Sequence, residues 1–241
     1  MQLRRHTFAT LGLIASASCA STQATAPSQL SAPKPAHGHG HHHGEHGMPH
    51  RFEHAEEWTK VFDDPARDAW QRPREIVAAM RIDPGMTIAD IGAGTGYFLP
   101  YLSEAAGPSG TVLGLDVEPD MVRFMRDRAQ RSHLDNVRSQ QVRPHDPSLS
   151  QGSVHRILIV DTWHHLADRE TYARKLRDSL APNGQLFIVD FTKDSPEGPP
   201  PSHRLSPAQV IEELTASGLR AESVAVPLPN QYVVRGRLPE R

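Results

Sequence analysis

The sequence predicts an α/β protein with a Rossmann-like, doubly wound and mostly parallel sheet. Three observations carry this prediction. From residue 87 onward, short aliphatic runs alternate with helical segments. The first of these runs, TIADI, has an acid, Asp90, next to its end and leads into a loop with glycine at every second position. The last two predicted strands lie too close together for a helical crossover, so we expect the last strand to run antiparallel.

The predicted elements follow one another in the order that such a sheet requires. Helices are expected at 53–64, 73–80, 96–106, 119–131, 168–180 and 207–217. Strands are expected at 87–91, 111–116, 137–142, 154–161, 185–191, 219–226 and 231–236. The Pro-Asn-Gly turn at 182–184 should close one helix, and Ser206 should cap the last one, with Gly218 ending it. These elements place an N-terminal helical cap at 52–84 and the main domain at 85–241.

The first residues of the chain resemble a bacterial lipoprotein signal. Residues 1–19 combine Arg4 and Arg5 with a short apolar run that ends at Cys19, the single cysteine of the chain. The run is shorter than the ~20 apolar residues that span a bilayer. We expect export and attachment to the membrane through lipidated Cys19, on the periplasmic side. The alternative is an uncleaved N-terminus of a cytoplasmic protein.

Residues 20–51 are expected to be a disordered linker, first Pro/Ser-rich and then His-rich, because such a composition cannot build a core. Imidazoles bind Zn, Ni or Cu, although the spacing here lacks the geometry of a structural site. The alternative is a solvated linker that binds metal only adventitiously. The candidate metal ligands are His37, His39, His41, His42, His43 and His46.

Composition excludes some classes of function. The formal net charge of the chain is -2, so no basic field favours nucleic acid as a partner. A single cysteine rules out an internal disulfide and a cysteine-based zinc site.

The glycine loop at 92–96 indicates which kind of ligand the domain binds. Ligands of open α/β sheets bind at the carboxyl ends of the strands, where this loop is expected. Its G-x-G-x-G spacing differs from the G-x-G-x-x-G of dinucleotide-binding proteins, which makes a dehydrogenase the weaker alternative. Asp116 ends the next strand, about 20 residues further on, where a carboxylate can accept both hydroxyls of a ribose. Asp116 could also simply cap the segment that follows it.

Four segments together resemble the class I S-adenosylmethionine-dependent methyltransferases. They are the glycine loop, the acid at Asp116, ILIVDTWHHL and LAPNGQLFIVDF, and the similarity covers roughly Arg74 to Arg235. The resemblance implies a methyltransferase with S-adenosylmethionine as cofactor and a small-molecule acceptor. Asp146 matches the acid near the adenine, or it makes only a turn with Pro147. The residues implied in cofactor binding are Asp90, Gly92, Ala93, Gly94, Thr95, Gly96, Asp116, Val117, Met121 and Asp146.

The candidate catalytic residues Asp161, His164 and His165 follow the fourth strand. A histidine with a pKa near neutrality could take a proton from a hydroxyl acceptor, and we favour His165. Either histidine could instead pack against the cofactor or start the next helix. Asp161 could orient a histidine or contact the amine of the cofactor. The side chains expected to offset the positive charge of the cofactor are Asp90, Tyr97 and Trp163.

Two further expectations complete the sequence-based picture. Trp58, Trp70 and Arg74 of the cap are expected to line the acceptor side. The competing function is a lipid-anchored protein that binds Zn, Ni or Cu on a non-catalytic methyltransferase-like fold. It is motivated by the export signal, since S-adenosylmethionine is made in the cytoplasm.

Overall fold

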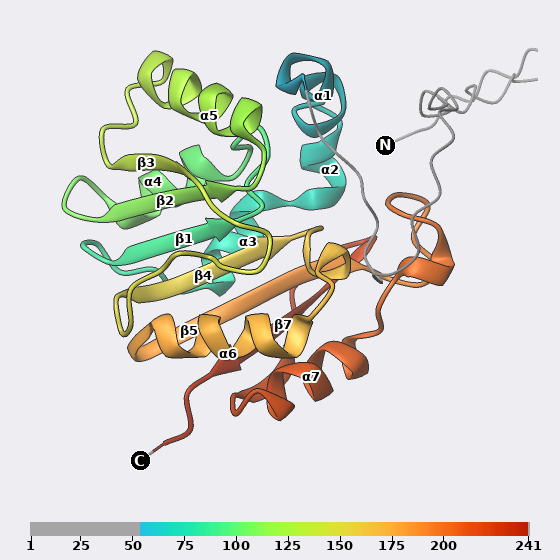
Figure 1. Ribbon diagram of the computed structural model, residues 1–241. Helices are drawn as coiled ribbons and strands as arrows, with labels where there is room; N and C mark the ends of the chain where they lie inside the picture. The colour runs from blue at the N-terminus through green and yellow to red at the C-terminus, as the bar shows by residue number, and fades with distance from the viewer. Residues whose placement is uncertain (1–53, 241) are drawn as a thin grey trace, which may run out of the picture. The chain divides into compact units, whose positions relative to one another are not determined.

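In the computed structural model, which describes residues 54–240, the chain forms a seven-stranded sheet with helices on both faces (Figure 1). The strand order is β3-β2-β1-β4-β5-β7-β6. Neighbouring strands from β3 to β5 are parallel, whereas β7 is antiparallel to both β5 and β6. The predicted fold class is therefore confirmed, including its antiparallel strand.

The predicted elements occur in the predicted order, and one further helix, α2, was not predicted. The strands are β1 Thr87–Ile91, β2 Thr111–Asp116, β3 Val137–Gln141, β4 Val154–Val160, β5 Leu180–Phe191, β6 Arg220–Val224 and β7 Gln231–Arg237. The α-helices are α1 Ala55–Phe62, α2 Arg67–Gln71, α3 Pro73–Ala79, α4 Leu99–Ala106, α5 Pro119–Arg131, α6 Arg169–Ser179 and α7 Pro207–Ala216. Two 3-10 turns are η1 Trp163–His165 and η2 Pro201–His203.

Each face of the sheet buries its own apolar core. Successive side chains of a strand point to opposite faces. In β1, Ile88 accordingly belongs to the core under α3, α4 and α5, and Ala89 belongs to the core under α6 and α7. Ile76 and Met80 share the core of Ile88, so α3 is built into the main domain, whereas α1 and α2 contribute no residue to either core. The predicted cap at 52–84 therefore has two parts. Helices α1 and α2 cover the domain, whereas α3 packs into its core.

Two boundaries differ from the prediction for reasons of backbone geometry. Helix α4 begins at Leu99 rather than at residue 96, because the glycines of the loop have positive φ angles that no α-helix contains. Strand β5 begins at Leu180 and includes residues 182–184, which were expected to form a turn. The pairing of β4 with β5 shifts register between Val154 and Arg156, and Asn183 has a φ of 63°. The Pro-Asn-Gly segment is therefore an irregularity within the strand.

Strand β1 marks the place where the strand order reverses. The chain proceeds from β1 to β2 and β3 on one side and returns to β4 and β5 on the other. From the carboxyl ends of β1 and β4 the chain continues to helices on opposite faces of the sheet, and open α/β sheets bind ligands at such a point. Helices α1 and α2 stand beside this edge in Figure 1.

The predicted signal at 1–19, with Cys19, and the linker at 20–51, with its histidines, lie outside the described residues. Within 54–240, no helix is long and apolar enough to cross a membrane.

Candidate cofactor and acceptor site

The glycine loop follows β1 and adopts a conformation that side chains would prevent. Gly92 has a φ of 70°, and a Cβ atom on it would lie 2.5 Å from the side chain of Thr162. The loops after β1 and β4 can therefore approach each other only because Gly92 lacks a side chain. Gly94 also has a positive φ, and its N–H points back to the end of β2, where it donates to Asp116 Oδ2 at 2.8 Å.

Asp116 is held by two backbone amides. Besides the bond from Gly94, its Oδ1 accepts from the N–H of Glu118 at 2.9 Å. Glu118 is the N-cap residue of α5, so the capping interpretation of Asp116 describes part of its role. Burial raises the pKa of this carboxyl, while the two amides act in the opposite direction. Each carboxylate oxygen has more than one lone pair, so Asp116 can still accept bonds from a ligand.

A cleft of about 660 Å³ opens beside Asp116. Val117 lines it and is 41% exposed, which is unusual for a large aliphatic side chain in this chain. Gln141, Arg143 and Pro144 lie on the other side. The cleft thus has an apolar side chain on one side and amide and guanidinium groups on the other. A flat heterocycle with polar edges requires this combination.

Two residues predicted to bind the cofactor have other partners. Asp146 is in a turn, where its Oδ1 accepts from the N–H of Ser148 at 2.9 Å and its backbone bridges to Arg143. Met121 is 1% exposed and packs within the protein. Contact of either residue with a cofactor stays a prediction.

Asp90 is the residue before the last one of β1 and is 3% exposed. Burial raises its pKa to about 7, the charge of Asp116 adds to this effect, and the Arg67 guanidinium opposes it. Near neutral pH the carboxyl is therefore balanced between its two protonation states. A cation that bound beside it would favour the ionised form.

Asp161 follows β4, the parallel neighbour of β1, and therefore lies at the same end of the sheet as Asp90. Its φ of 53° lies in the left-handed region, which turns the chain sharply away from the strand. Gln231 Nε2 donates to its Oδ1 at 2.5 Å, and Arg67 Nη2 lies 3.7 Å from its Oδ2. Burial raises the pKa of Asp161 to about 7, and Arg67 is the main opposing influence.

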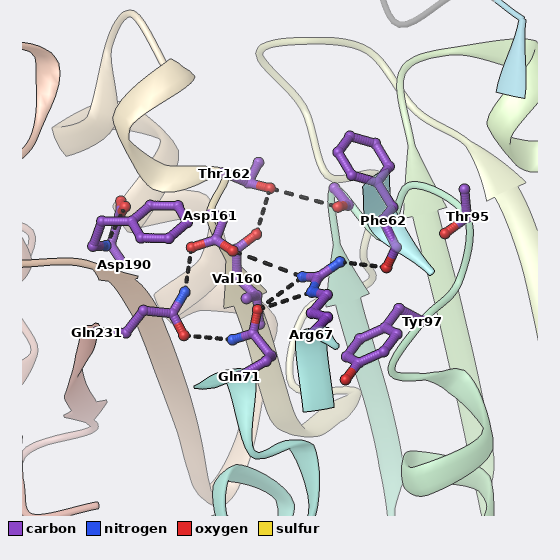
Figure 2. A network of polar contacts seen from close by, with 12 residues as sticks. Phe62, Arg67, Gln71, Thr95, Tyr97, Val160, Asp161, Thr162, Asp190 and Gln231 are labelled. Atoms are coloured by element: carbon purple, nitrogen blue, oxygen red, sulfur yellow. Dashed lines mark hydrogen bonds and ion pairs between the residues drawn. The ribbon is translucent and has the colours of Figure 1, made fainter. Parts of the chain in front are cut away.

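Arg67 is a functional candidate that no sequence motif marks. Its Nη1 donates to the carbonyl of Phe62 at 2.8 Å, and its Nε and Nη2 both donate to Gln71 Oε1, at 3.1 and 2.9 Å. Gln71 Nε2 in turn donates to Gln231 Oε1 at 2.5 Å. Together with the contacts of Asp161, these bonds form a closed ring of four side chains (Figure 2). Its members are Arg67, Gln71, Gln231 and Asp161. The ring joins α2 to the ends of β4 and β7, which are distant in sequence.

The two histidines lie together beside this ring. The side chain of His164 is only 2% exposed, and its Nδ1 lies 2.9 Å from both carboxylate oxygens of Asp190. The ring of His165 packs against that of His164, with their centroids 4.2 Å apart. Asp190, at the end of β5, is fully buried and was not foreseen from the sequence. The structure thus brings His164 to a buried acid, and the catalytic role of either histidine stays a prediction.

The expectation that Trp163 faces the cofactor is wrong. The 3-10 turn η1 directs its ring into the core under α6 and α7, where it is fully buried. Its Nε1 donates to Glu213 Oε2 at 2.8 Å, which fixes this orientation. Tyr97, by contrast, lies at the site with its ring centroid 4.3 Å from the Arg67 guanidinium.

The aromatic residues of the cap divide between two places. Trp70 packs against Phe191, which follows Asp190, with ring centroids 5.9 Å apart. Trp58 stacks on Phe62, over the glycine loop. Arg74 does not line the site as expected, because its side chain is 72% exposed and pairs with Glu104 at the surface.

Metal binding finds no support within residues 54–240, which contain no cluster of three or more His, Cys, Asp or Glu side chains arranged to hold an ion. The candidate ligands His37, His39, His41, His42, His43 and His46 lie outside this range.

Comparisons with known proteins agree with this geometry. The family model of a methyltransferase domain matches residues 82–223. The chain is 25% identical over 125 residues to a demethylmenaquinone methyltransferase of Listeria welshimeri, covering 52% of this chain and 53% of that protein. It is 28% identical over 159 residues to the nocamycin O-methyltransferase of Saccharothrix syringae, covering 65% and 54%. The chain therefore spans about half the length of the curated relatives it matches.

A solved structure extends the similarity to the whole described domain. The crystal structure of an S-adenosylmethionine-dependent methyltransferase from Aquifex aeolicus matches with a TM-score of 0.71 and 28% sequence identity. The match covers 77% of this chain and 98% of that one.

The burial of Asp90 predicts a stability that depends on pH. The folded protein keeps the Asp90 proton up to about pH 7, whereas the unfolded chain releases it near pH 3.8, so raising the pH through this window lowers the free energy of unfolding. Asparagine does not ionise. We therefore expect Asp90→Asn to raise the free energy of unfolding by about 2–4 kcal/mol at pH 8, and by less than half of that at pH 5. Chemical denaturation at both pH values measures the difference.

Asp135→Asn is the matched control, because Asp135 is exposed and should give no gain at either pH. An equal gain for Asp90→Asn at pH 5 and pH 8 would show that ionisation is not the cause.

Proposed function

This chain belongs to the family of S-adenosylmethionine-dependent methyltransferases, and we propose that it methylates a small, planar acceptor that bears an acidic hydroxyl. The observation that carries the proposal is the glycine loop at 92–96, held between the carboxyl groups of Asp90 and Asp116 at the point where the strand order reverses.

The residues at this edge fit the cofactor. The cleft beside Val117 suits the adenine, and Asp116 has lone pairs for the ribose hydroxyls. The carboxyl of Asp90, which is buried beside the glycine loop, suits the ammonium group of the cofactor. When bound, the cofactor supplies a methyl group on a positively charged sulfur, so the protein needs only to bind, orient and shield the reactants.

Helices α1 and α2 are suited to exclude water from the loop. Phe62 is 3.5 Å from where a Cβ of Gly94 would lie. The next residue, Asp63, accepts a hydrogen bond from Thr95 Oγ1 at 2.9 Å and pairs with Arg128 of α5 at 2.7 Å. A site closed in this way strengthens the interaction of its carboxylates with a bound cation.

Asp161 is the general base in this proposal. Its side chain keeps 20% exposure, against 2% for His164, so it can reach an acceptor. Its pKa of about 7 suits the removal of a proton from an acidic hydroxyl near neutral pH. His165 is the second candidate for the base. His164, which contacts Asp190, packs behind the ring of His165 and supports it.

The acceptor class follows from the side chains around Asp161. Trp70, which packs on the buried ring of Phe191, offers an aromatic face, which suits a planar ring. The relatives named a demethylmenaquinone methyltransferase and a nocamycin O-methyltransferase are in keeping with small-molecule acceptors.

For the segments outside 54–240, we propose export and anchoring through lipidated Cys19, with a cytoplasmic protein as the alternative. Support comes from the pattern of residues 1–19 alone. Fractionation of the full chain and of Cys19→Ser tests it: wild type should be recovered with the membrane and the variant should not. Recovery of wild type only in the cytosol would overturn the proposal.

Binding of S-adenosylmethionine should depend on Asp116. Loss of the carboxylate removes charge-assisted bonds to the ribose, so we expect Asp116→Ala to weaken binding about 100-fold in a calorimetric titration. Asp146→Ala is the matched control, with an expected change below about 3-fold if Asp146 serves only its turn. Absence of binding by folded wild-type protein would favour the alternative, a metal-binding protein on a non-catalytic fold.

The base can be identified from pH–rate profiles. We expect Asp161→Asn to lower kcat by about 10²–10⁴-fold and to abolish a rising limb near pH 7, because the group that accepts the proton is lost. Release of S-adenosylhomocysteine with a panel of phenols, catechols and hydroquinones provides the assay. His165→Gln is the comparison, and a larger loss there than in Asp161→Asn would assign the base to His165.

A further inference from the structure

Arg67 is a buried cation whose hydrogen-bonding capacity is only partly used. Its side chain is 12% exposed. Of its five N–H donors, one is bonded to the carbonyl of Phe62 and two to Gln71. One N–H on each terminal nitrogen is left for another acceptor.

The charge of Arg67 is also poorly matched by the protein itself. Within residues 54–240, Asp161 is the only carboxylate at ion-pair distance, and at 3.7 Å it is beyond hydrogen-bonding length. A buried guanidinium normally meets a carboxylate at about 2.7–2.9 Å, often through two parallel bonds. Asp161 is meanwhile held by Gln231 on its other oxygen.

Arg67 lies at the end of the site that the ends of β1 and β4 form, and it does not line the cleft beside Val117. It influences the pKa of both Asp90 and Asp161, and its guanidinium covers the ring of Tyr97, which directly follows the glycine loop. This end therefore combines an acid suited to an ammonium group with a cation suited to a carboxylate. The two charges of an amino-acid group require that combination.

We infer that Arg67 binds the α-carboxylate of the cofactor's amino-acid group, opposite the ammonium that Asp90 receives. This inference rests on the proposed cofactor. Arg67 thereby makes the site specific for the complete amino-acid group.

Three ligands test this assignment by calorimetry on the full chain. S-adenosylhomocysteine has both charges, its decarboxylated analogue lacks only the carboxylate, and methylthioadenosine lacks the whole amino-acid group. We expect wild type to bind S-adenosylhomocysteine about 100-fold more tightly than the decarboxylated analogue. We expect Arg67→Met to lose this preference while binding the analogue within about 3-fold of wild type, and Arg67→Lys to keep part of it.

Arg74→Met is the matched control, since Arg74 is an exposed arginine of the neighbouring helix and should leave all three affinities unchanged. Equal weakening of all ligands by Arg67→Met would show a structural role and overturn the inference. Wild type that did not distinguish the first two ligands would also overturn it, without recourse to any variant. If wild type bound none of the three, the proposed cofactor itself would be refuted, and the inference with it.

Discussion

The burial of two carboxyl groups at the adjoining ends of β1 and β4 is the constraint on which the site depends. Parallel pairing of these strands brings Asp90 and Asp161 to one edge of the sheet, where little water reaches them. Burial of a charge is costly unless another charge or a proton compensates for it. The chain compensates only in part, with Arg67, so both carboxyl groups have a pKa of about 7. Such an edge is poorly stabilised when empty and well suited to a cationic ligand.

The same constraint gives the covering helices a chemical role. Helix α2 has five residues and cannot be stable by itself. It is held by the chain of bonds from Arg67 through Gln71 to Gln231, and the segment before it by Asp63 on the glycine loop. A ligand that engaged Arg67 would therefore also fix α2 against the sheet.

Local patterns explain why most of the fold was predictable. The strand periodicity, Pro119 at the first turn of α5 and the capping box at Ser206 each act over a few residues. The site was predictable only where a motif marks it, as at the glycine loop. Gln71 and Gln231 are 160 positions apart, and no local pattern pairs them. Trp163 was assigned the wrong direction because a single 3-10 turn decides which core receives its ring.

The loop after β5 shows which wall of the acceptor side is rigid. Although rich in proline, it is fixed by Arg204, which is 5% exposed. The guanidinium of Arg204 donates to the carbonyls of Thr192, Lys193, Ser195, Glu197 and Pro199. Phe191, which the loop covers at Gly198, is thereby held in place. Trp70, its aromatic partner, belongs to α2, whose position depends on the polar ring around Arg67. One side of the proposed acceptor site is therefore fixed by Arg204, and the other side depends on the contacts that hold α2.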